Sequence, residues 1–276
     1  MSLESETLKF SVTPKIEGAE VGRKGSIYLV ATPIGNLDDI TLRALNVLRD
    51  VDLVAAEDTR RTGMLLAHYD MKKKLVSYHE HNERSRANEI VRMAEEGMNI
   101  AVVSDAGTPA ISDPGCAVVK SAIDAGIDVV PVPGPTAFVS ALITSGLSTD
   151  EFTFIGFLPR KSTKRRTKLE LIKNIGTTLI FYESPHRLEE MMEDALSVLG
   201  DRACCVTREI TKKFEETKRG KISEVLQSIR EGEPRGEYVI LVNGIFENDT
   251  QTDDEGRPVR RSHENKYAKY SKYDDK

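Results

Sequence analysis

Hydrophobic positions along the first half of the chain alternate between two spacings. Short runs of consecutive apolar, often β-branched residues are separated by segments in which apolar residues recur every three or four positions. The runs predict buried strands at SIYLVAT (26–32), DLVAAE (52–57), KLVSYH (74–79), IAVVS (100–104) and DVVPV (128–132). The segments between them predict helices at about 39–49, 60–69, 83–96, 114–125 and 136–145. This alternation is typical of an α/β fold with a mostly parallel sheet.

The pattern starts again after residue 151. Further strands are expected at 152–159, 178–183, 203–210 and 237–243, with a basic helical stretch after the first of them and helices at 186–199 and 222–231. The helix at 186–199 carries one apolar stripe, which predicts a core contact: Leu188, Met191, Met192, Ala195, Leu196 and Leu199. We therefore expect two α/β domains, at 25–134 and 135–246. The ends, 1–24 and 247–276, lack apolar periodicity and are expected to be disordered.

Composition narrows the class of protein. A chain of 276 residues with 39% apolar content can bury two ordinary cores. The net charge is −5 although 30% of residues are charged, so any contact with nucleic acid has to be local. The three cysteines, Cys116, Cys204 and Cys205, form neither a disulfide framework nor a metal-binding CxxC pair. With no signal-like or membrane-spanning apolar stretch, we expect a cytoplasmic protein that is not in a membrane.

The loop SDAGTPAISDPG (104–115) follows an expected strand at the edge where open parallel sheets bind ligands. Two more Gly/Pro loops, ATPIGNLDDIT (31–41) and VPGPTA (132–137), follow other expected strands. Parallel strands end at one edge, so the three loops should meet there. Within the first loop, Asp113 followed by Pro114 also predicts the N-cap and first position of a helix.

Carboxylates rather than phosphate-binding motifs mark this loop. Neither GxGxxG nor GxxxxGK[ST] occurs in the chain. Asp105 and Asp113 suit a ligand that presents hydroxyls, an ammonium or another cation, as S-adenosylmethionine does. The alternative is that Asp113 only caps a helix and Asp105 only makes an Asx-turn.

Seven motifs then carry a resemblance to a known family. VATPIGNLDDIT, AAEDTRRT, SDAGTPAISDPG, VPVPGPTA, FIGFLPRK, YESPHR and TREITKKFEE occur in this order within residues 25–244. The sequence resembles the tetrapyrrole-methylase superfamily, and within it the bacterial 16S ribosomal RNA cytidine 2′-O-methyltransferases. The resemblance implies a class III methyltransferase of two α/β domains with S-adenosylmethionine in the cleft between them. It also implies a homodimer that acts on 16S RNA in the small (30S) ribosomal subunit.

The same resemblance implies the residues of the site. The family's cofactor contacts fall on Pro33, Asp105, Gly107, Thr108, Ala110, Ser112, Pro135, Thr136 and Ala137, with Tyr182 and Glu183 contributing. A general base for the 2′-hydroxyl would lie among Glu57, Asp58, His79 and His81. The HxH spacing with no cysteine and no close third ligand does not indicate zinc, so no metal is expected.

Basic residues predict where RNA binds. The run LPRKSTKRRTK (158–168) supplies Arg160, Lys161, Lys164, Arg165 and Arg166, which are expected to hold phosphates. Arg60, Arg61, His186 and Arg187 are expected to guide the ribose or neighbouring phosphates. The alternative is that the run is only a solvated helix face. The absence of tryptophan argues against base stacking as the main mode of binding.

Three other functions stay open at this point. Another methylase of the same superfamily, acting on a tetrapyrrole or other small molecule, would favour a large apolar cleft without basic surroundings. A nucleotide-dependent oxidoreductase would share the α/β sheet but lacks its glycine fingerprint here. A non-enzymatic RNA-binding module would leave the three clustered loops unexplained.

Overall fold

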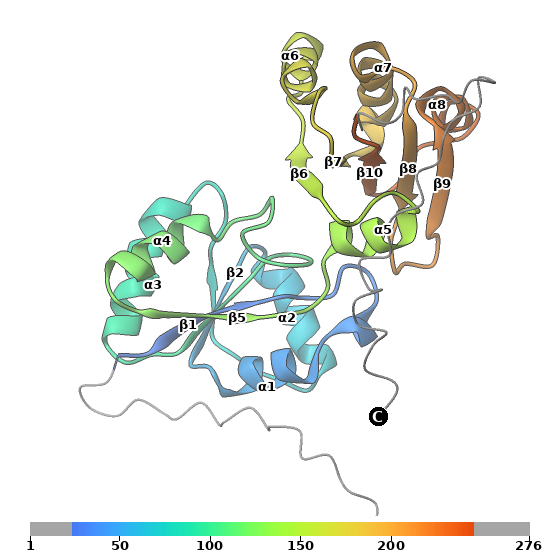
Figure 1. Ribbon diagram of the computed structural model, residues 1–276. Helices are drawn as coiled ribbons and strands as arrows, with labels where there is room; N and C mark the ends of the chain where they lie inside the picture. Colours follow the sequence, from blue (N-terminus) through green and yellow to red (C-terminus); the bar gives the residue numbers. More distant parts are fainter. Residues whose placement is uncertain (1–23, 246–276) are drawn as a thin grey trace, which may run out of the picture.

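The computed structural model describes residues 24–245, which form two α/β units seen as separate lobes in Figure 1. The first unit contains one five-stranded sheet in the order β3-β2-β4-β1-β5, and all of its strand pairs are parallel. Its strands are β1 (Ser26–Val30), β2 (Leu53–Ala56), β3 (Leu75–Ser77), β4 (Ile100–Val103) and β5 (Asp128–Val132). The parallel sheet predicted from the apolar runs is confirmed.

Helices cover both faces of this sheet. On one face α1 (Leu42–Asp50) and α2 (Thr59–His68) pack against alternate strand residues such as Val30 and Val54. On the other, α3 (Glu83–Glu95) and α4 (Cys116–Asp124) pack against the intervening residues, such as Ile27 and Leu53. The chain leaves β1 toward the first face and β4 toward the second, although β1 and β4 are neighbours. Their carboxyl ends therefore form a topological switch point, where such sheets bind ligands.

The second unit has a mixed five-stranded sheet in the order β6-β7-β10-β8-β9. Its strands are β6 (Phe152–Phe157), β7 (Thr178–Glu183), β8 (Ala203–Arg208), β9 (Glu216–Lys221) and β10 (Tyr238–Val242). Only β6 and β7 pair in parallel. One face is covered by α6 (Ser162–Ile172), α7 (Leu188–Leu199) and α8 (Ile222–Arg230), and the other by α5 (Ala137–Ser145). Short 3-10 helices lie at Leu37–Asp39 and Pro185–Arg187.

One prediction made from a local pattern was wrong, and one strand was not predicted. The helix expected from Asp113 begins at Cys116, and its N-cap is Gly115 with φ of +150°, so Asp113 does not cap it. The strand β9, with the sequence ETKRGK, was not predicted because it has no apolar residue. It lies at the edge of the sheet, where charged side chains protect an open strand from pairing with another chain.

Other predictions have clear outcomes. The apolar stripe of α7 is confirmed as core, with Leu196 partly buried and its other five members buried. The ends expected to be disordered, 1–24 and 247–276, lie outside the described residues except for Lys24, whose Nζ donates to the carbonyl of Ala125 at 2.8 Å. In the described part of the chain no helix has the length and apolar character needed to span a membrane.

A buried ion pair joins α6 to α7. Arg165 and Asp194 are 1% and 3% exposed, and Arg165 Nε donates to Asp194 Oδ2 at 2.6 Å. Arg166 and Ser162 also donate to this carboxylate. Burial raises the pKa of Asp194, but the hydrogen bonds from Arg166, Arg165 and Ser162 outweigh it and hold the pKa below its usual value. The prediction that Arg165 contacts RNA is corrected, since its guanidinium is enclosed and bound to Asp194.

We expect Asp194→Asn to lower the free energy of unfolding by about 3–5 kcal/mol, because the buried Arg165 would lose its carboxylate partner. Urea denaturation measures the loss. Glu190→Gln is the matched control, since Glu190 contacts the same guanidinium at 3.3 Å from an exposed position, and its loss should stay below about 1 kcal/mol. The difference between Asp194→Asn and wild type should shrink in acid, as the carboxylate of lowered pKa becomes protonated in the folded state. Equal losses in the two variants would contradict this account.

Candidate functional site: an acidic cleft between the two units

The three Gly/Pro loops meet at the carboxyl edge of the first sheet. Thr32 and Gly107 exchange two backbone hydrogen bonds, each of 2.9 Å, which join loop 31–41 to loop 104–115. Thr108 Oγ1 lies 2.7 Å from Thr136 Oγ1 and donates to the carbonyl of Pro135 at 3.2 Å, which joins loop 104–115 to loop 132–137. The predicted gathering of the loops is confirmed.

Loop 104–115 is held in a strained conformation. Gly107 has φ of +81°, and a Cβ there would lie 3.3 Å from Ile34 Cγ2. Ala110 and Ser112 are not glycines but have φ of +68° and +61°. Left-handed backbone at such residues costs about 1–3 kcal/mol each and occurs mainly where a site requires it. The surrounding hydrogen bonds therefore fix a conformation that the loop would not adopt alone.

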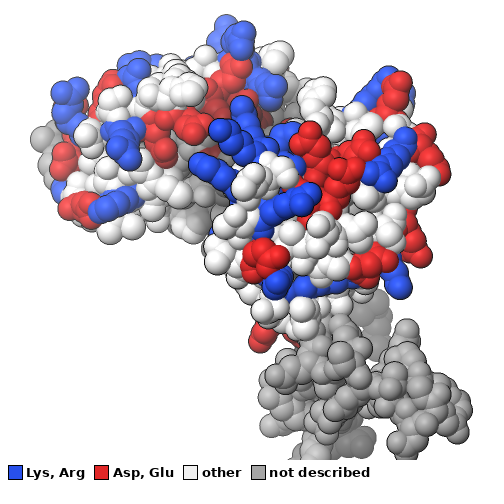
Figure 2. Space-filling model, turned by 90° about the horizontal axis from the view of Figure 1, so that it is seen from above, with Lys and Arg blue, Asp and Glu red and all other residues white. Residues whose placement is uncertain are grey.

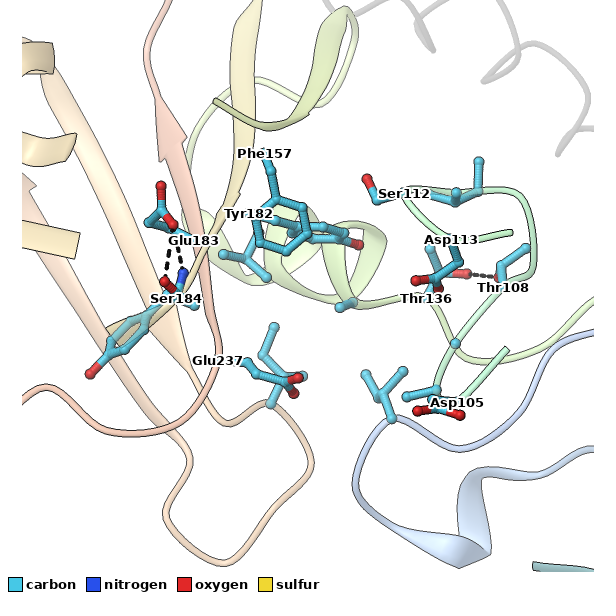
Figure 3. Close-up of a pocket in the computed structure, with 18 of the residues that line it drawn as sticks. Asp105, Thr108, Ser112, Asp113, Thr136, Phe157, Tyr182, Glu183, Ser184 and Glu237 are labelled. Carbon is cyan, nitrogen blue, oxygen red and sulfur yellow. Dashed lines mark hydrogen bonds between the residues drawn. The ribbon is translucent and has the colours of Figure 1, made fainter. Parts of the chain in front are cut away.

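These loops form one wall of a cleft of about 380 Å³ whose other wall belongs to the second unit. Figure 3 shows Asp105, Thr108, Ser112, Asp113 and Thr136 on one side and Phe157, Tyr182, Glu183, Ser184 and Glu237 on the other. The remaining lining residues are Ile34, Glu57, Arg61, Ala106, Gly107, Ile111, Ala137, Pro185, Glu209, Ile210, Lys212, Tyr238 and Val239. Both units therefore contribute to the site.

Carboxylates dominate the polar lining. Glu57, Asp105 and Asp113 come from the first unit, and Glu183, Glu209 and Glu237 come from the second, against two basic lining residues, Arg61 and Lys212. Like charges held this close favour a ligand that carries positive charge. The lining also presents threonine and serine hydroxyls beside apolar side chains. The cleft thus suits a small cationic molecule with both polar and apolar parts.

The acidic residues of the first unit interact closely. The Asp105 N–H donates to Glu57 Oε2 at 3.1 Å, and the Asp58 N–H donates to Asp105 Oδ1 at 2.9 Å. Arg61 Nη1 lies 3.3 Å from Asp105 Oδ2. Burial raises the pKa of Glu57. Burial, followed by the charge of Glu57, raises the pKa of Asp113 to about 7.

A loop of the second unit closes one end of the cleft, and sequence reasoning assigned it no site residue. Lys212 Nζ donates to Glu209 Oε1 at 2.8 Å and to Glu237 Oε2 at 3.0 Å, and Lys212 packs so close to Gly35 that a Cβ there would lie 2.3 Å from Lys212 Cγ. Glu209 and Thr211 have positive φ, which is a second strained segment beside the cleft. The motif TREITKKFEE was noted, but no local signal shows which of its side chains reach the site.

The expected cofactor residues divide into two groups. The cleft is lined by Asp105, Gly107, Thr108, Ser112, Thr136, Ala137, Tyr182 and Glu183. Pro33, Ala110 and Pro135 belong to the same loops but do not line the described cleft. Asp113, for which the sequence left open a role toward a cationic ligand or as a helix cap, lines the cleft, and the N-cap of α4 is Gly115 instead.

Of the four candidates for the general base, only one lines the described cleft. Among the base candidates Glu57 lines the cleft, while Asp58 accepts from the Arg60 N–H at the start of α2, and its hydrogen bonds with Arg60 lower its pKa. His79 and His81 pack with ring centroids 5.9 Å apart and do not line the described cleft. Within residues 24–245 no group of three or more His, Cys, Asp or Glu side chains is placed to hold a metal ion.

Basic side chains gather beside the cleft. Figure 2, seen from above, shows a group of Lys and Arg over α6 where the second unit faces the first, next to acidic side chains over α7. Arg160, Lys161, Lys164 and Arg166 are exposed. His186 is also exposed, and Arg187 is half-buried and donates to the carbonyl of Leu158 at 2.7 Å.

The chain thus combines two α/β units, a strained Gly/Pro loop at a switch point and an acidic cleft between the two sheets. The family model for Tetrapyrrole (Corrin/Porphyrin) Methylases matches residues 26–226. The chain belongs to this family, as the seven motifs predicted.

Curated relatives agree with this assignment, and solved structures share the fold. The chain is 53% identical over 221 residues to ribosomal RNA small subunit methyltransferase I of Halalkalibacterium halodurans, which covers 80% of this chain and 76% of the relative. It is 49% identical over 231 residues to the protein of the same name from Bacillus subtilis, covering 84% and 78%. Similar folds include diphthine synthase, with a TM-score of 0.63 at 13% identity, covering 80% of this chain and 90% of that one. A uroporphyrin-III C-methyl transferase from Thermus thermophilus complexed with S-adenyl homocysteine has a TM-score of 0.58 at 19% identity, covering 79% and 97%.

The raised pKa of Asp113 leads to a prediction about stability. In the folded protein the Asp113 carboxyl stays protonated at pH values well above its ordinary pKa of 3.8. The unfolded chain releases that proton at lower pH, so the free energy of unfolding should fall as the pH rises from about 4 to about 7. Asp113→Asn removes this dependence, and the variant should gain up to a few kcal/mol over wild type across that interval. Melting temperatures across the interval measure the effect. Asp124→Asn, which alters an exposed carboxylate paired with Lys120 on α4, is the control. A constant difference between Asp113→Asn and wild type would show that Asp113 is not held protonated.

Proposed function

We propose that this protein transfers the methyl group of S-adenosylmethionine to the ribose 2′-oxygen of a cytidine in 16S ribosomal RNA of the small subunit. The observation that carries the proposal is the identity of 53% and 49% to ribosomal RNA small subunit methyltransferases I over most of their lengths. The resemblance of the motifs leads us to propose cytidine 1402 as the nucleotide. It also leads us to propose a cytoplasmic homodimer, whose state light scattering would measure.

The cleft fits S-adenosylmethionine on physical grounds. Its volume of about 380 Å³ lies in the range of small-molecule sites. The carboxylates complement a ligand with sulfonium and ammonium charges, and Ile34, Ile111 and Val239 offer apolar surface for a heterocycle. When bound, the cofactor would supply an electrophilic methyl group. We propose that the lining residues Asp105, Gly107, Thr108, Ser112, Thr136, Ala137, Tyr182 and Glu183 hold it, with Pro33, Ala110 and Pro135 shaping the loops behind them.

The residues of the cleft would act mainly by positioning. Holding the acceptor oxygen in line with the methyl group and excluding water supplies about 7–11 kcal/mol of the barrier reduction. Of the base candidates we propose Glu57, because it lines the cleft and because burial raises its pKa, which makes it a better proton acceptor. Asp58, His79 and His81 are held in hydrogen bonds or ring contacts away from the lining.

RNA would approach over the basic side chains beside the cleft. We propose Arg160, Lys161, Lys164 and Arg166 as phosphate contacts, together with Arg60, Arg61, His186 and Arg187 near the cleft. These basic surroundings favour a polyanionic substrate over a tetrapyrrole or another small molecule. Phosphate contacts bind without reading sequence, so recognition of the nucleotide requires other groups.

The function is tested by incubating purified protein with S-adenosylmethionine and small subunits that lack ribose methylation. Mass-spectrometric mapping of the 16S RNA should then show one new 2′-O-methylated cytidine. The double variant Asp105→Ala, Gly107→Val removes a carboxylate and crowds Ile34, and should weaken cofactor binding about 5- to 150-fold in calorimetry. Asp124→Ala, on the surface of α4, is its control. An unchanged map would overturn the proposed substrate, whereas unchanged affinity in the double variant would place the cofactor elsewhere.

The basic run yields a separate prediction. Replacing Arg160, Lys161 and Lys164 by glutamine should raise the KM for subunits and lower the logarithmic salt dependence of binding by about 0.7 to 0.9 per lost phosphate contact. Affinity for the cofactor should not change. Glutamine at Lys72, Lys74 and Arg92, which are exposed on the first unit, is the matched control. Normal methylation by the triple variant at every salt concentration would show that RNA enters over another surface.

A further inference from the structure

A second hollow adjoins the cleft on the side of the second unit. It has a volume of about 730 Å³ and is lined by residues 157–160, 183–184 and 186–187. Phe157, Glu183 and Ser184 line both spaces, so the two adjoin at these residues. A molecule in the hollow would therefore touch the same residues as a molecule in the cleft.

Phe157 is a large apolar residue that is exposed to solvent. It lies at the end of strand β6, and 55% of it is exposed. Its direction is set by a bulge in β6, where the pairing with β7 skips from Phe154 to Gly156. Without the bulge, Phe157 would pair with Glu183 and face α6 and α7. With it, Phe157 pairs with Tyr182 and faces the cleft. Bulges commonly redirect a side chain in this way beside active sites.

The bulge lies directly against loop 104–115. Gly156 has φ of +70°, and a Cβ there would lie 2.7 Å from Ser112 Oγ. A residue with a side chain at 156 would be strained in that backbone conformation and would also displace Ser112. The position of Phe157 is therefore coupled to loop 104–115, which forms the other wall of the cleft.

Aromatic neighbours hold the ring of Phe157 in place. Its centroid lies 5.7 Å from that of Tyr182, which lies 5.1 Å from Phe154, which in turn lies 4.6 Å from Phe138. The Phe138 N–H donates to the Tyr182 hydroxyl at 3.2 Å and fixes the middle of the series. Figure 3 shows the rings of Phe157 and Tyr182 together, between Glu183 and the cleft. Phe157 is thus one exposed end of a connected aromatic series, whose other exposed end, Phe152, has its ring centroid 6.0 Å from that of Phe138.

Two arginines and a histidine lie in the same hollow as this exposed ring. Arg160, His186 and Arg187 all line the hollow. Arg187 Nη2 is held by the carbonyl of Leu158 and lies 3.2 Å from Glu183 Oε2, while Arg160 and His186 are exposed. An exposed aromatic surface beside arginine side chains is the combination that binds single-stranded nucleotides, by base stacking and phosphate contact.

We propose that this hollow holds the acceptor nucleotide, with its base unstacked from the RNA and placed on the ring of Phe157. Arg160 and His186 contact the flanking phosphates, and the ribose lies over Glu183 and Ser184, where the hollow opens to the cleft. This inference rests on the proposed function and names its acceptor site. One well-placed aromatic is sufficient for this, although the chain has few aromatic residues and no tryptophan.

The test compares Phe157→Ala with Phe157→Tyr in initial-rate methylation of unmethylated small subunits. Loss of a stacked base should lower kcat/KM of Phe157→Ala about 5- to 150-fold, while Phe157→Tyr retains an aromatic face and stays near wild type. Affinity for S-adenosylhomocysteine, measured by calorimetry, should be the same in all of them. Phe152→Ala is the matched control, since Phe152 is an exposed phenylalanine (44%) on the same strand that lines neither space.

Each other outcome overturns the inference in a recognisable way. Unchanged kcat/KM in Phe157→Ala would show that the base lies elsewhere. Loss of S-adenosylhomocysteine affinity in Phe157→Ala would assign the ring to the cofactor, and a loss in Phe157→Tyr equal to that in Phe157→Ala would exclude stacking. A wild-type protein that binds the cofactor but does not methylate subunits would instead overturn the proposed function, and the acceptor site with it.

Discussion

The backbone pair between Thr32 and Gly107 joins two loops that follow neighbouring strands but lead to opposite faces of the sheet. The backbone of a loop at a sheet edge has no neighbouring strand to bond with. Its N–H and C=O groups therefore need hydrogen-bond partners from another loop or from water. Here the partners come from the next loop, and Gly107 with positive φ allows the close approach. The side chains of Asp105, Thr108 and Asp113 are presented to the cleft only because this backbone arrangement is fixed.

The second unit depends on the same arrangement for its place opposite the loops. Gly35 of the first loop admits Lys212, and Ser112 of the second loop lies against Gly156 in β6. Each contact requires a residue without a side chain on one side. These close contacts leave little room for the second unit to slide against the loops of the first. The acidic side chains of both units are thereby brought together around one small cleft.

Much of this structure could be predicted from the sequence because it is repetitive and local. Apolar runs identified the strands of the first sheet, and Gly/Pro loops identified the binding edge. What failed depends on distant partners: β9 is a strand because β8 offers an edge, and Arg165 is buried because Asp194, on another helix, neutralises it. The sequence left two roles open for Asp113, because a helix start at Gly115 requires a φ of +150° that no spacing rule reveals. On the second wall, Tyr182 and Glu183 were expected from the motif resemblance, whereas the places of Lys212 and Phe157 become visible only when the two sheets face one another.

The contact between Ser112 and Gly156 also limits how the protein can evolve. A Cβ at 156 would lie 2.7 Å from Ser112 Oγ, so a larger residue at either position has to be accommodated at the other. One of these positions belongs to the loop that lines the cleft, and the other sets the direction of Phe157. Mutational drift on one wall is thereby transmitted to the opposite wall. We expect the two positions to change together or not at all among descendants of this sequence.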